Sequence, residues 1–214
     1  KRFSRLHVFL LFGALLVAGA CAEQSSNPAP YTEGTDYVTL PAPYQRYSNS
    51  GKVEVVEVFS YACIHCAEFA PDAEKLRKEL PAGAEFKLMP APFSDEWLPF
   101  ARAYYAAREL GVVDRTHLQL FVARFDQHYP INSMDELADF YAKHGVNRAD
   151  FLRIATSDAT TAKMKRDLDL ARTWQVDGTP TLMIDGKYRV VTVRSHARML
   201  AVAMWLAKRE LAGK

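Results

Sequence analysis

Two cysteines three positions apart, Cys63 and Cys66, are the residues of this chain best suited to chemistry. They lie in the stretch FSYACIHCAEFAP, between a valine-rich run and a segment whose apolar residues recur at helical spacing. Cysteines at positions i and i+3 of a helix share one face, at a separation compatible with a disulfide bond. Such a pair can exchange electrons with other thiols, bind a metal ion or act as a structural bridge.

The expected place of the pair at the start of a helix favours redox chemistry. Unpaired backbone N–H groups and the positive end of the helix dipole stabilise a thiolate there and lower its pKa. Cys63, at the junction, is predicted to be the exposed nucleophile, and Cys66, one turn later, the resolving thiol. His65 between them is predicted to favour the Cys63 thiolate; the alternative is an exposed helix residue without a role.

The remaining cysteine and histidines argue against a metal site. Cys21 is the only further cysteine, and four histidines show no paired spacing: His117, His128, His144 and His196. A purely structural bridge between the paired cysteines would close a tiny loop and stabilise the fold little. We therefore expect a redox pair, with no metal ion and no cofactor.

The N-terminus has the features of an export signal. Three basic residues precede the apolar run LHVFLLFGALLVAGA, which is shorter than the about 20 residues of a membrane span. Small residues at the end of this run predict cleavage after Ala20 or Ala22. The alternative is a retained anchor helix.

Cys21 directly follows this run and resembles the lipidation site of bacterial lipoproteins. That motif usually has leucine three residues before the cysteine, whereas this chain has Ala18. Lipidation and ordinary cleavage both stay open, and both predict export from the cytoplasm. We expect a periplasmic protein, which is anchored in the membrane if Cys21 is lipidated.

Composition argues for a globular protein that does not bind nucleic acid. Hydrophobic residues make up 49% of the 214 residues and charged residues 24%. Removal of residues 1–22, which hold three basic and no acidic residues, leaves 24 basic and 25 acidic residues. A nucleic-acid binder would show a basic excess, and this chain does not.

Apolar periodicity predicts the order of the elements. Strands are expected at 36–40, 52–60 and 84–93 and a hairpin at 179–191; helices are expected at 63–80, 96–111, 116–129, 133–145, 147–157, 159–176 and 196–211. Strands near both ends of the chain need each other to complete one sheet, so the helical block between them is predicted to be an insertion. The predicted division is an export signal (1–22), a linker (23–35), an α/β sheet domain (36–93 and 162–212) and an inserted helical domain (94–161).

These features resemble the thioredoxin fold, and the helical insertion narrows the resemblance to bacterial DsbA-type thiol:disulfide oxidoreductases. The segments EVFSYACIHCAEFAP and GTPTLMIDGKYRV are similar to the active-site and proline-loop segments of that family. One departure is the dipeptide between the cysteines, which is Ile64-His65 here and most familiar as Pro-His in the family.

The resemblance implies roles for further residues. Pro180 is expected to be a cis-proline facing the disulfide, with the Thr179 backbone pairing with an extended substrate; a trans turn proline is the alternative. Glu57 matches an acidic residue of the family that lies beneath the active site and assists proton movement. The alternative for Glu57 is an edge-facing salt bridge, and Lys87 is a weak candidate for the lysine that accompanies this acid in the family.

The resemblance also implies an activity and partners. The expected protein is a monomeric oxidase that donates its disulfide to unfolded exported proteins and is reoxidised by a membrane partner of the DsbB kind. One alternative is a disulfide isomerase or reductase, although residues 23–35 are too short for the dimerisation domain that isomerases usually carry. Another is a noncatalytic peptide-binding chaperone, which would keep its activity after Cys63→Ser.

Overall fold

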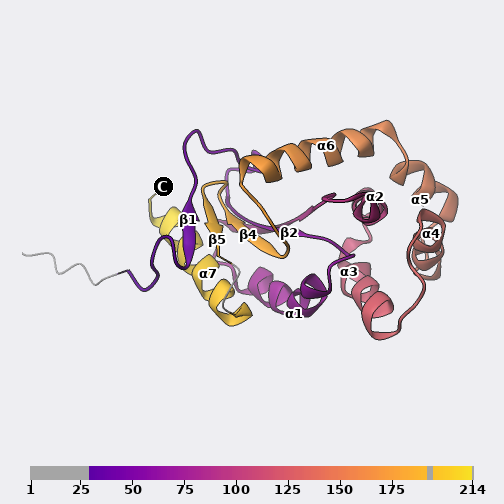
Figure 1. Cartoon of the computed structure of the whole chain (residues 1–214), viewed down its shortest axis with the longest axis horizontal. Coiled ribbons are helices and arrows are strands. Elements are labelled where there is room, and N and C mark those ends of the chain that lie inside the picture. The colour runs from indigo at the N-terminus through magenta and orange to yellow at the C-terminus, as the bar shows by residue number, and fades with distance from the viewer. Residues whose placement is uncertain (1–28, 192–194, 214) are drawn as a thin grey trace, which may run out of the picture. The chain divides into compact units, whose positions relative to one another are not determined.

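A five-stranded mixed sheet organises the chain (Figure 1). The computed structural model describes residues 29–191 and 195–213. The elements described belong to the unit Tyr31–Lys214; the predicted export signal, Cys21 and residues 23–28 of the predicted linker lie outside the described residues. The sheet has the order β1-β5-β4-β2-β3, built from β1 (Tyr37–Thr39), β2 (Val53–Phe59), β3 (Ala84–Pro90), β4 (Thr181–Ile184) and β5 (Tyr188–Val190).

The sheet joins strands from both ends of the chain, as predicted. β2 pairs with β3 in parallel and with β4 antiparallel, so a strand from the second half lies beside the strand that leads to the cysteines. The β4–β5 turn at Asp185 and Gly186 has positive φ at both residues, 51° and 66°, and Lys187 N–H donates to the Ile184 carbonyl at 2.9 Å. This Asp-Gly turn closes the hairpin predicted over 179–191.

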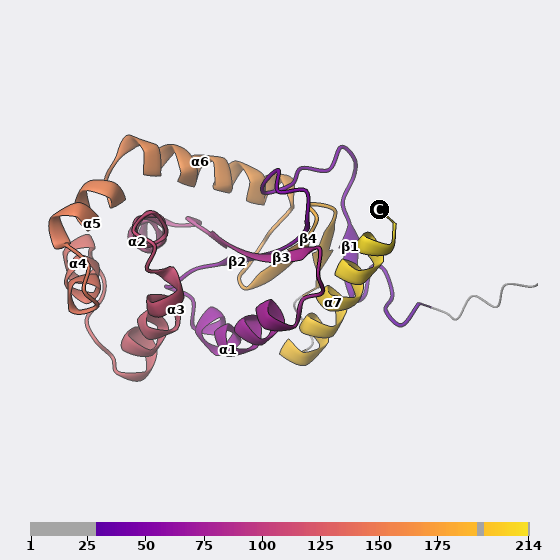
Figure 2. The same cartoon turned by 180° about the vertical axis from the view of Figure 1, so that it is seen from behind.

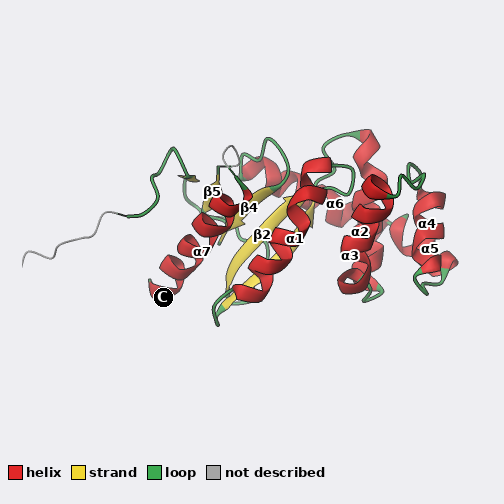
Figure 3. Cartoon of the chain, turned by 90° about the horizontal axis from the view of Figure 1, so that it is seen from below, coloured by secondary structure: helices red, strands yellow, loops and turns green. Residues whose placement is uncertain are grey.

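Helices cover both faces of the sheet (Figures 1 and 2). On one face lie α1 (Ile64–Glu79) and α7 (His196–Ala212), which Figure 3 shows in front of the strands, and on the other lies α6 (Asp158–Thr173). No helix in residues 29–191 and 195–213 is long and apolar enough to cross a membrane.

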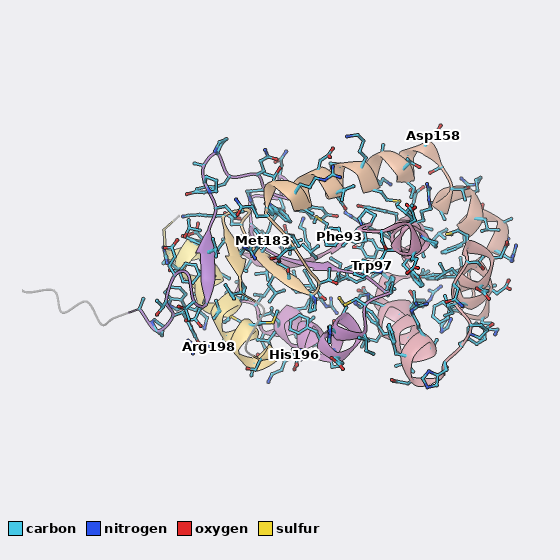
Figure 4. All side chains as sticks on the ribbon, in the orientation of Figure 1. Phe93, Trp97, Asp158, Met183, His196 and Arg198 are labelled. Carbon is cyan, nitrogen blue, oxygen red and sulfur yellow. The ribbon has the colours of Figure 1, made fainter. Side chains whose placement is uncertain are left out.

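Alternation along β2 explains these two layers, because successive side chains of a strand point to opposite faces. Val55 packs in the cluster with α1 and α7, whereas Val56 packs with the fully buried Trp174 beneath α6. Met183 of β4, labelled in Figure 4, belongs to the α6 side as well. Glu57 therefore points to the α1 side, the same side as Val55.

The helical block follows β3. It consists of a short 3₁₀ turn η1 (Asp95–Trp97), α2 (Leu98–Glu109), α3 (Val113–Phe121), the π-helix η2 (Val122–Asp126), α4 (Met134–Lys143) and α5 (Arg148–Ala155). The chain then enters α6, a continuous helix that crosses the predicted boundary between residues 161 and 162. The division into domains stays a prediction.

The segment predicted as one helix over 116–129 differs from the structure. It begins earlier, at Val113, and from Val122 it continues as a π-helix, in which Gln127 N–H donates to the Val122 carbonyl at 2.9 Å. The segment ends near His128, whose φ is 51°. Apolar periodicity does not distinguish these two kinds of turn, because a π-helical turn adds one residue without changing the residue types.

Ser133 begins α4 as its N-cap and bonds with Glu136, three residues later. Its hydroxyl accepts from the Glu136 N–H at 3.2 Å and donates to the Glu136 carboxylate at 3.0 Å. We expect Ser133→Ala to lower the free energy of unfolding by about 1 kcal/mol, because a helix N–H loses its acceptor. Urea unfolding measures this change. The matched control is Ser94→Ala, since Ser94 precedes η1 without a side-chain cap bond; an equal loss in both variants would contradict the capping role.

Candidate active site

The two cysteines lie where β2 ends and α1 begins. Cys63 is the N-cap of α1 with extended backbone angles, and its N–H donates to the Ser60 carbonyl at 3.1 Å. The first turn of α1 holds no acidic residue, so no carboxylate competes for its backbone N–H groups. The junction therefore places a sulfur at a helix N-terminus, as predicted.

The two thiols are free and differ in burial. Cys63 keeps 9% of its surface exposed, whereas Cys66 is completely buried. The structure is thus that of the reduced form. A sulfur from another molecule can reach Cys63 but not Cys66, while the roles of nucleophile and resolving thiol stay a prediction.

The environment of Cys63 favours its thiolate. The Cys66 thiol donates a hydrogen bond to it, and this bond, with further ones from the Thr179 hydroxyl and the backbone N–H groups of Cys66 and His65, lowers the pKa of Cys63 to about 5 against the opposing effect of burial. The Thr179 hydroxyl is buried and bonds to no other group among the described residues, so it can donate to the Cys63 sulfur once that sulfur is a thiolate. Hydrogen bonds to the charged form are a direct way to lower a pKa.

The environment of Cys66 does the opposite. Burial raises the pKa of the Cys66 thiol far above its ordinary value, and the hydrogen bond to Cys63 and the charges of Glu57 and Cys63 act in the same direction. Cys66 is therefore a thiol at every physiological pH. When the pair is reduced, it therefore consists of a Cys63 thiolate in contact with a Cys66 thiol.

The proline loop lies against the nucleophile. The Thr179–Pro180 peptide bond is cis, as the resemblance implied, and Thr181 pairs with Val58 of β2 one residue before the end of that strand. This register brings the Thr179 carbonyl oxygen to 3.4 Å from Sγ of Cys63, so the thiol form donates a hydrogen bond to it. Segments 116 residues apart in sequence thus meet at one sulfur.

Glu57 is a buried carboxyl group beneath the pair. It is 1% exposed, and its Oε2 atom has no hydrogen-bond partner among the described residues. Burial, and second the charge of Cys63, raise the pKa of Glu57 to about 8, so the group holds a proton at neutral pH. It lines a cavity of about 170 Å³ that also borders His117 and the charged residues Glu74 and Arg77. A void of this size has room for water.

Lys87 does not accompany Glu57, so this candidate from the sequence is wrong. Lys87 lies opposite Val56 in the parallel register, and its Nζ contacts Ser48 at 2.6 Å, Glu85 at 3.1 Å and the buried Glu54 at 3.5 Å. The neighbour of Glu57 in β3 is Leu88. A shift of one residue along a strand reverses the face, so Lys87 points away from Glu57.

His65 is close to the pair only through its backbone. The His65 side chain is 71% exposed, and its Nδ1 lies 3.2 Å from the Glu68 carboxylate. Its backbone N–H, rather than its imidazole, is among the groups that lower the pKa of Cys63. Any role of the imidazole in the reaction stays a hypothesis.

An aromatic cluster behind the two cysteines includes His117, which sequence reasoning did not place near the active site. His117 Nδ1 lies 2.9 Å from the Tyr61 hydroxyl, and its ring packs edge-on against Phe59 and Phe121. Burial lowers the pKa of His117 to about 4, so the imidazole is neutral. Within residues 29–191 and 195–213, no three His, Cys, Asp or Glu side chains group closely enough to hold a metal ion.

We expect the reduced protein to show one thiolate titration near pH 5, followed by ultraviolet thiolate absorbance. This pKa lies below that of an unfolded cysteine, so the thiolate stabilises the reduced fold fully above about pH 8.5, by about 3 kcal/mol at pH 7, and not at all once the pH falls below about 5. Cys63→Ser should abolish the transition, and Cys66→Ala should move it toward the ordinary value. A midpoint near 8.5 in the unaltered protein would show that the site does not favour the thiolate.

The comparisons with known proteins agree with this geometry. A family model described as a DSBA-like thioredoxin domain matches residues 54–205. The thiol:disulfide interchange protein DsbA of Pseudomonas aeruginosa is 34% identical over 180 residues, which are 84% of this chain and 85% of that protein; DsbA of Burkholderia cepacia is 32% identical over 181 residues, again 84% and 85%. The crystal structure of the oxidoreductase DsbA from Xylella fastidiosa matches with a TM-score of 0.80 at 34% identity and covers 85% of this chain and 98% of that one.

The matched region contains both segments that meet at the nucleophile, the Cys63–Cys66 stretch and the Thr179–Pro180 loop, together with the helices between them. The curated relatives match over most of their own length, so the likeness concerns the whole folded part and not the cysteine motif alone. The chain therefore belongs to the DsbA-like family of thiol:disulfide oxidoreductases, with a thioredoxin fold and an inserted helical domain.

Proposed function

We propose that this protein introduces disulfide bonds into exported proteins by exchange at Cys63-Ile64-His65-Cys66. The observation that carries the proposal is the contrast between the two thiols: Cys63 is reachable and its pKa is lowered to about 5, whereas Cys66 is buried and its pKa is raised. A low pKa stabilises the dithiol form relative to the disulfide, so the disulfide is a strong oxidant. This direction favours an oxidase over a reductase.

The proposed exchange has two steps. A client thiolate attacks Sγ of Cys63 in the disulfide form, a client–Cys63 bond forms, and the Cys66 sulfur leaves with the electron pair. A second client thiolate then attacks the client sulfur of this mixed disulfide, and Cys63 leaves as a thiolate. The client loses two electrons and gains a disulfide, while the protein gains two electrons and becomes the dithiol form.

The Cys66 sulfur needs a proton when it leaves, because its site is fully buried. We assign this role to Glu57, whose carboxyl group is protonated at neutral pH and borders a cavity with room for water. Loss of the proton to Cys66 creates a carboxylate in a buried site, and water in the cavity returns the proton. Glu57 is thus the proposed proton donor.

The proline loop is the proposed binding site for the client backbone. Thr179 holds its carbonyl 3.4 Å from the nucleophile, two residues before the start of β4, where an extended client segment can pair with it as an added strand. Pro180 follows directly and supports the loop. For His65 we retain a proposed electrostatic role toward the thiolate, which its exposed imidazole can exert only from a distance.

Partners and location follow from the same proposal. The clients are unfolded exported proteins, the reoxidising partner is a membrane protein of the DsbB kind, and the protein acts as a monomer in the periplasm. The export signal (1–22) with its lipidation alternative at Cys21, the linker (23–35), the sheet domain (36–93 and 162–212) and the inserted helical domain (94–161) remain part of this proposal.

The test is oxidation of a reduced, unfolded protein whose native form contains disulfides. We expect one client disulfide per molecule of oxidised protein and an equilibrium with glutathione that gives a potential above about −200 mV. Cys63→Ser and Cys66→Ser should both abolish oxidation, since neither variant can form the disulfide. A potential near the about −270 mV of thioredoxin would indicate a reductase. Suppression of client aggregation that survives Cys63→Ser, without oxidation, would indicate a chaperone.

Glu57→Gln tests the proposed proton donor. We expect formation of the mixed disulfide to slow by about tenfold at pH 7, because the leaving sulfur of Cys66 loses its nearby acid. The ratio of the two rates should approach one above about pH 8, where Glu57 itself loses its proton. Stopped-flow kinetics with a small thiol measures both. Glu79→Gln, an exposed position at the far end of α1, is the control; a ratio that does not change with pH would exclude proton donation by Glu57.

A further inference from the structure

An apolar groove begins next to the nucleophile. Three large hydrophobic side chains are strongly exposed among the described residues, and two of them, Ile64 at 44% and Leu118 at 38%, line this one groove. The third, Tyr44, lies elsewhere, beside Lys187. Single exposed hydrophobic residues are ordinary, whereas neighbouring ones in a hollow mark a binding surface.

The groove lies between two helices that face each other. Its first wall is the face of α1 that carries Ile64, Ala67, Glu68 and Pro71, at positions i, i+3, i+4 and i+7. The second wall is formed by Leu118 of α3 and by residues of η2. Small side chains on α1 leave a volume of about 250 Å³ between the walls.

The π-helix η2 supplies the far end of the groove. Val122, Phe125 and Asp126, three of its five residues, line the groove. A π-helical turn is less stable than an α-helical one and occurs mostly at functional sites. Its place here, opposite the first turns of α1, is a second sign that the groove has a use.

The charges of the groove are all acidic. Glu68 and Asp126 are its only charged lining residues, and both are exposed. The Glu68 carboxylate has the His65 imidazole as its neighbour, and Asp126 makes no ion pair with any residue that the structure describes. An apolar floor with an acidic rim fits an aliphatic side chain that is followed by a basic one.

We propose that this groove selects clients: it binds an aliphatic–basic pair of residues close to the client cysteine that reacts with Cys63. The inference rests on the proposed oxidase function and adds a preference among its substrates. The groove runs along eight residues of α1, from Ile64 to Pro71, a rise of roughly 10 Å. Three residues of an extended client chain span the same length, so the preferred pair lies about three positions from the client cysteine.

Other occupants fit the groove less well. A stable dimer needs about 800 Å² from each partner, more than a single side-chain groove provides. The acidic rim would repel the anionic head groups of a lipid surface. A short client segment needs no large contact area, because the mixed disulfide with Cys63 already holds it in place. A weak side-chain contact is then enough to discriminate between clients.

Synthetic dithiol peptides test the proposal on the oxidised full chain. Three peptides differ only at the pair three positions from one cysteine: Leu-Arg, Leu-Glu and Ala-Arg. We expect the second-order rate constant of oxidation for Leu-Arg to exceed that of Leu-Glu by about fivefold, as an exposed charge pair allows, and that of Ala-Arg by about fivefold or more.

Two variants and two controls show whether the groove residues cause these two peptide preferences. Asp126→Asn should reduce the preference for arginine over glutamate, and Leu118→Ala the preference for leucine over alanine. The matched controls are Asp158→Asn, at the start of α6 and away from α1 in Figure 4, and Tyr44→Ala, the exposed aromatic outside the groove. Both controls should keep the two preferences. Equal rates for the three peptides, or preferences that survive Asp126→Asn and Leu118→Ala, would overturn the proposal.

A small dithiol, dithiothreitol, separates this proposal from the proposed function. Failure to oxidise dithiothreitol would overturn the proposed oxidase function itself. Oxidation of dithiothreitol without discrimination among the peptides would overturn only the proposed role of the groove. Two further results would assign the groove to another occupant and overturn the client role. The first is a concentration-dependent dimer that Leu118→Ala dissociates. The second is a Leu118→Ala variant that is no longer reoxidised in membrane vesicles although it oxidises the peptides at an unchanged rate.

Discussion

The hydrogen bond between the two cysteines is the interaction on which the rest of this site depends. It stabilises Cys63 as a thiolate although the sulfur is mostly buried, and it does so only while Cys66 remains a thiol. The fold holds both conditions at once: the start of α1 directs N–H groups at Cys63, and one helical turn places Cys66 beneath it, away from water. The same burial gives the two sulfurs opposite acidities.

Burial also explains why the carboxyl group beneath the pair is useful. A charge on Glu57 would be close to the Cys63 thiolate and remote from water, so both effects keep the acid protonated. In the disulfide form Cys63 carries no charge, and burial, the larger of the two effects, still favours the protonated acid when the disulfide is attacked and the Cys66 sulfur leaves. A lysine beside Glu57 would have removed this property by favouring the carboxylate, and the strand register turns Lys87 to the opposite face.

The sequence indicated the fold well where residue types alone determine local structure. The strand over β2, the hairpin with its Asp185-Gly186 turn and the helix that Ser133 caps each have a physical cause in the residue types, and the structure contains all three. The features that were missed depend on tertiary packing. The face of Lys87 depends on the register between two strands, and the π-helix η2 has no residue type that marks it; the contact of the His65 imidazole with Glu68 was likewise not visible in the spacing. The groove joins residues more than fifty positions apart, and no local pattern reports such a meeting.

The two contact regions proposed around Cys63 would divide the work of recognition. The Thr179 loop offers backbone groups, and backbone pairing accepts any extended segment, which suits an enzyme with many clients. The groove between α1 and α3 offers side-chain contacts, and these distinguish one client from another only weakly. A covalent mixed disulfide tolerates this weakness, because the client stays in place until the second thiol attacks. Affinity is therefore supplied by the sulfur–sulfur bond, and the helical insertion is free to bias which client forms that bond first.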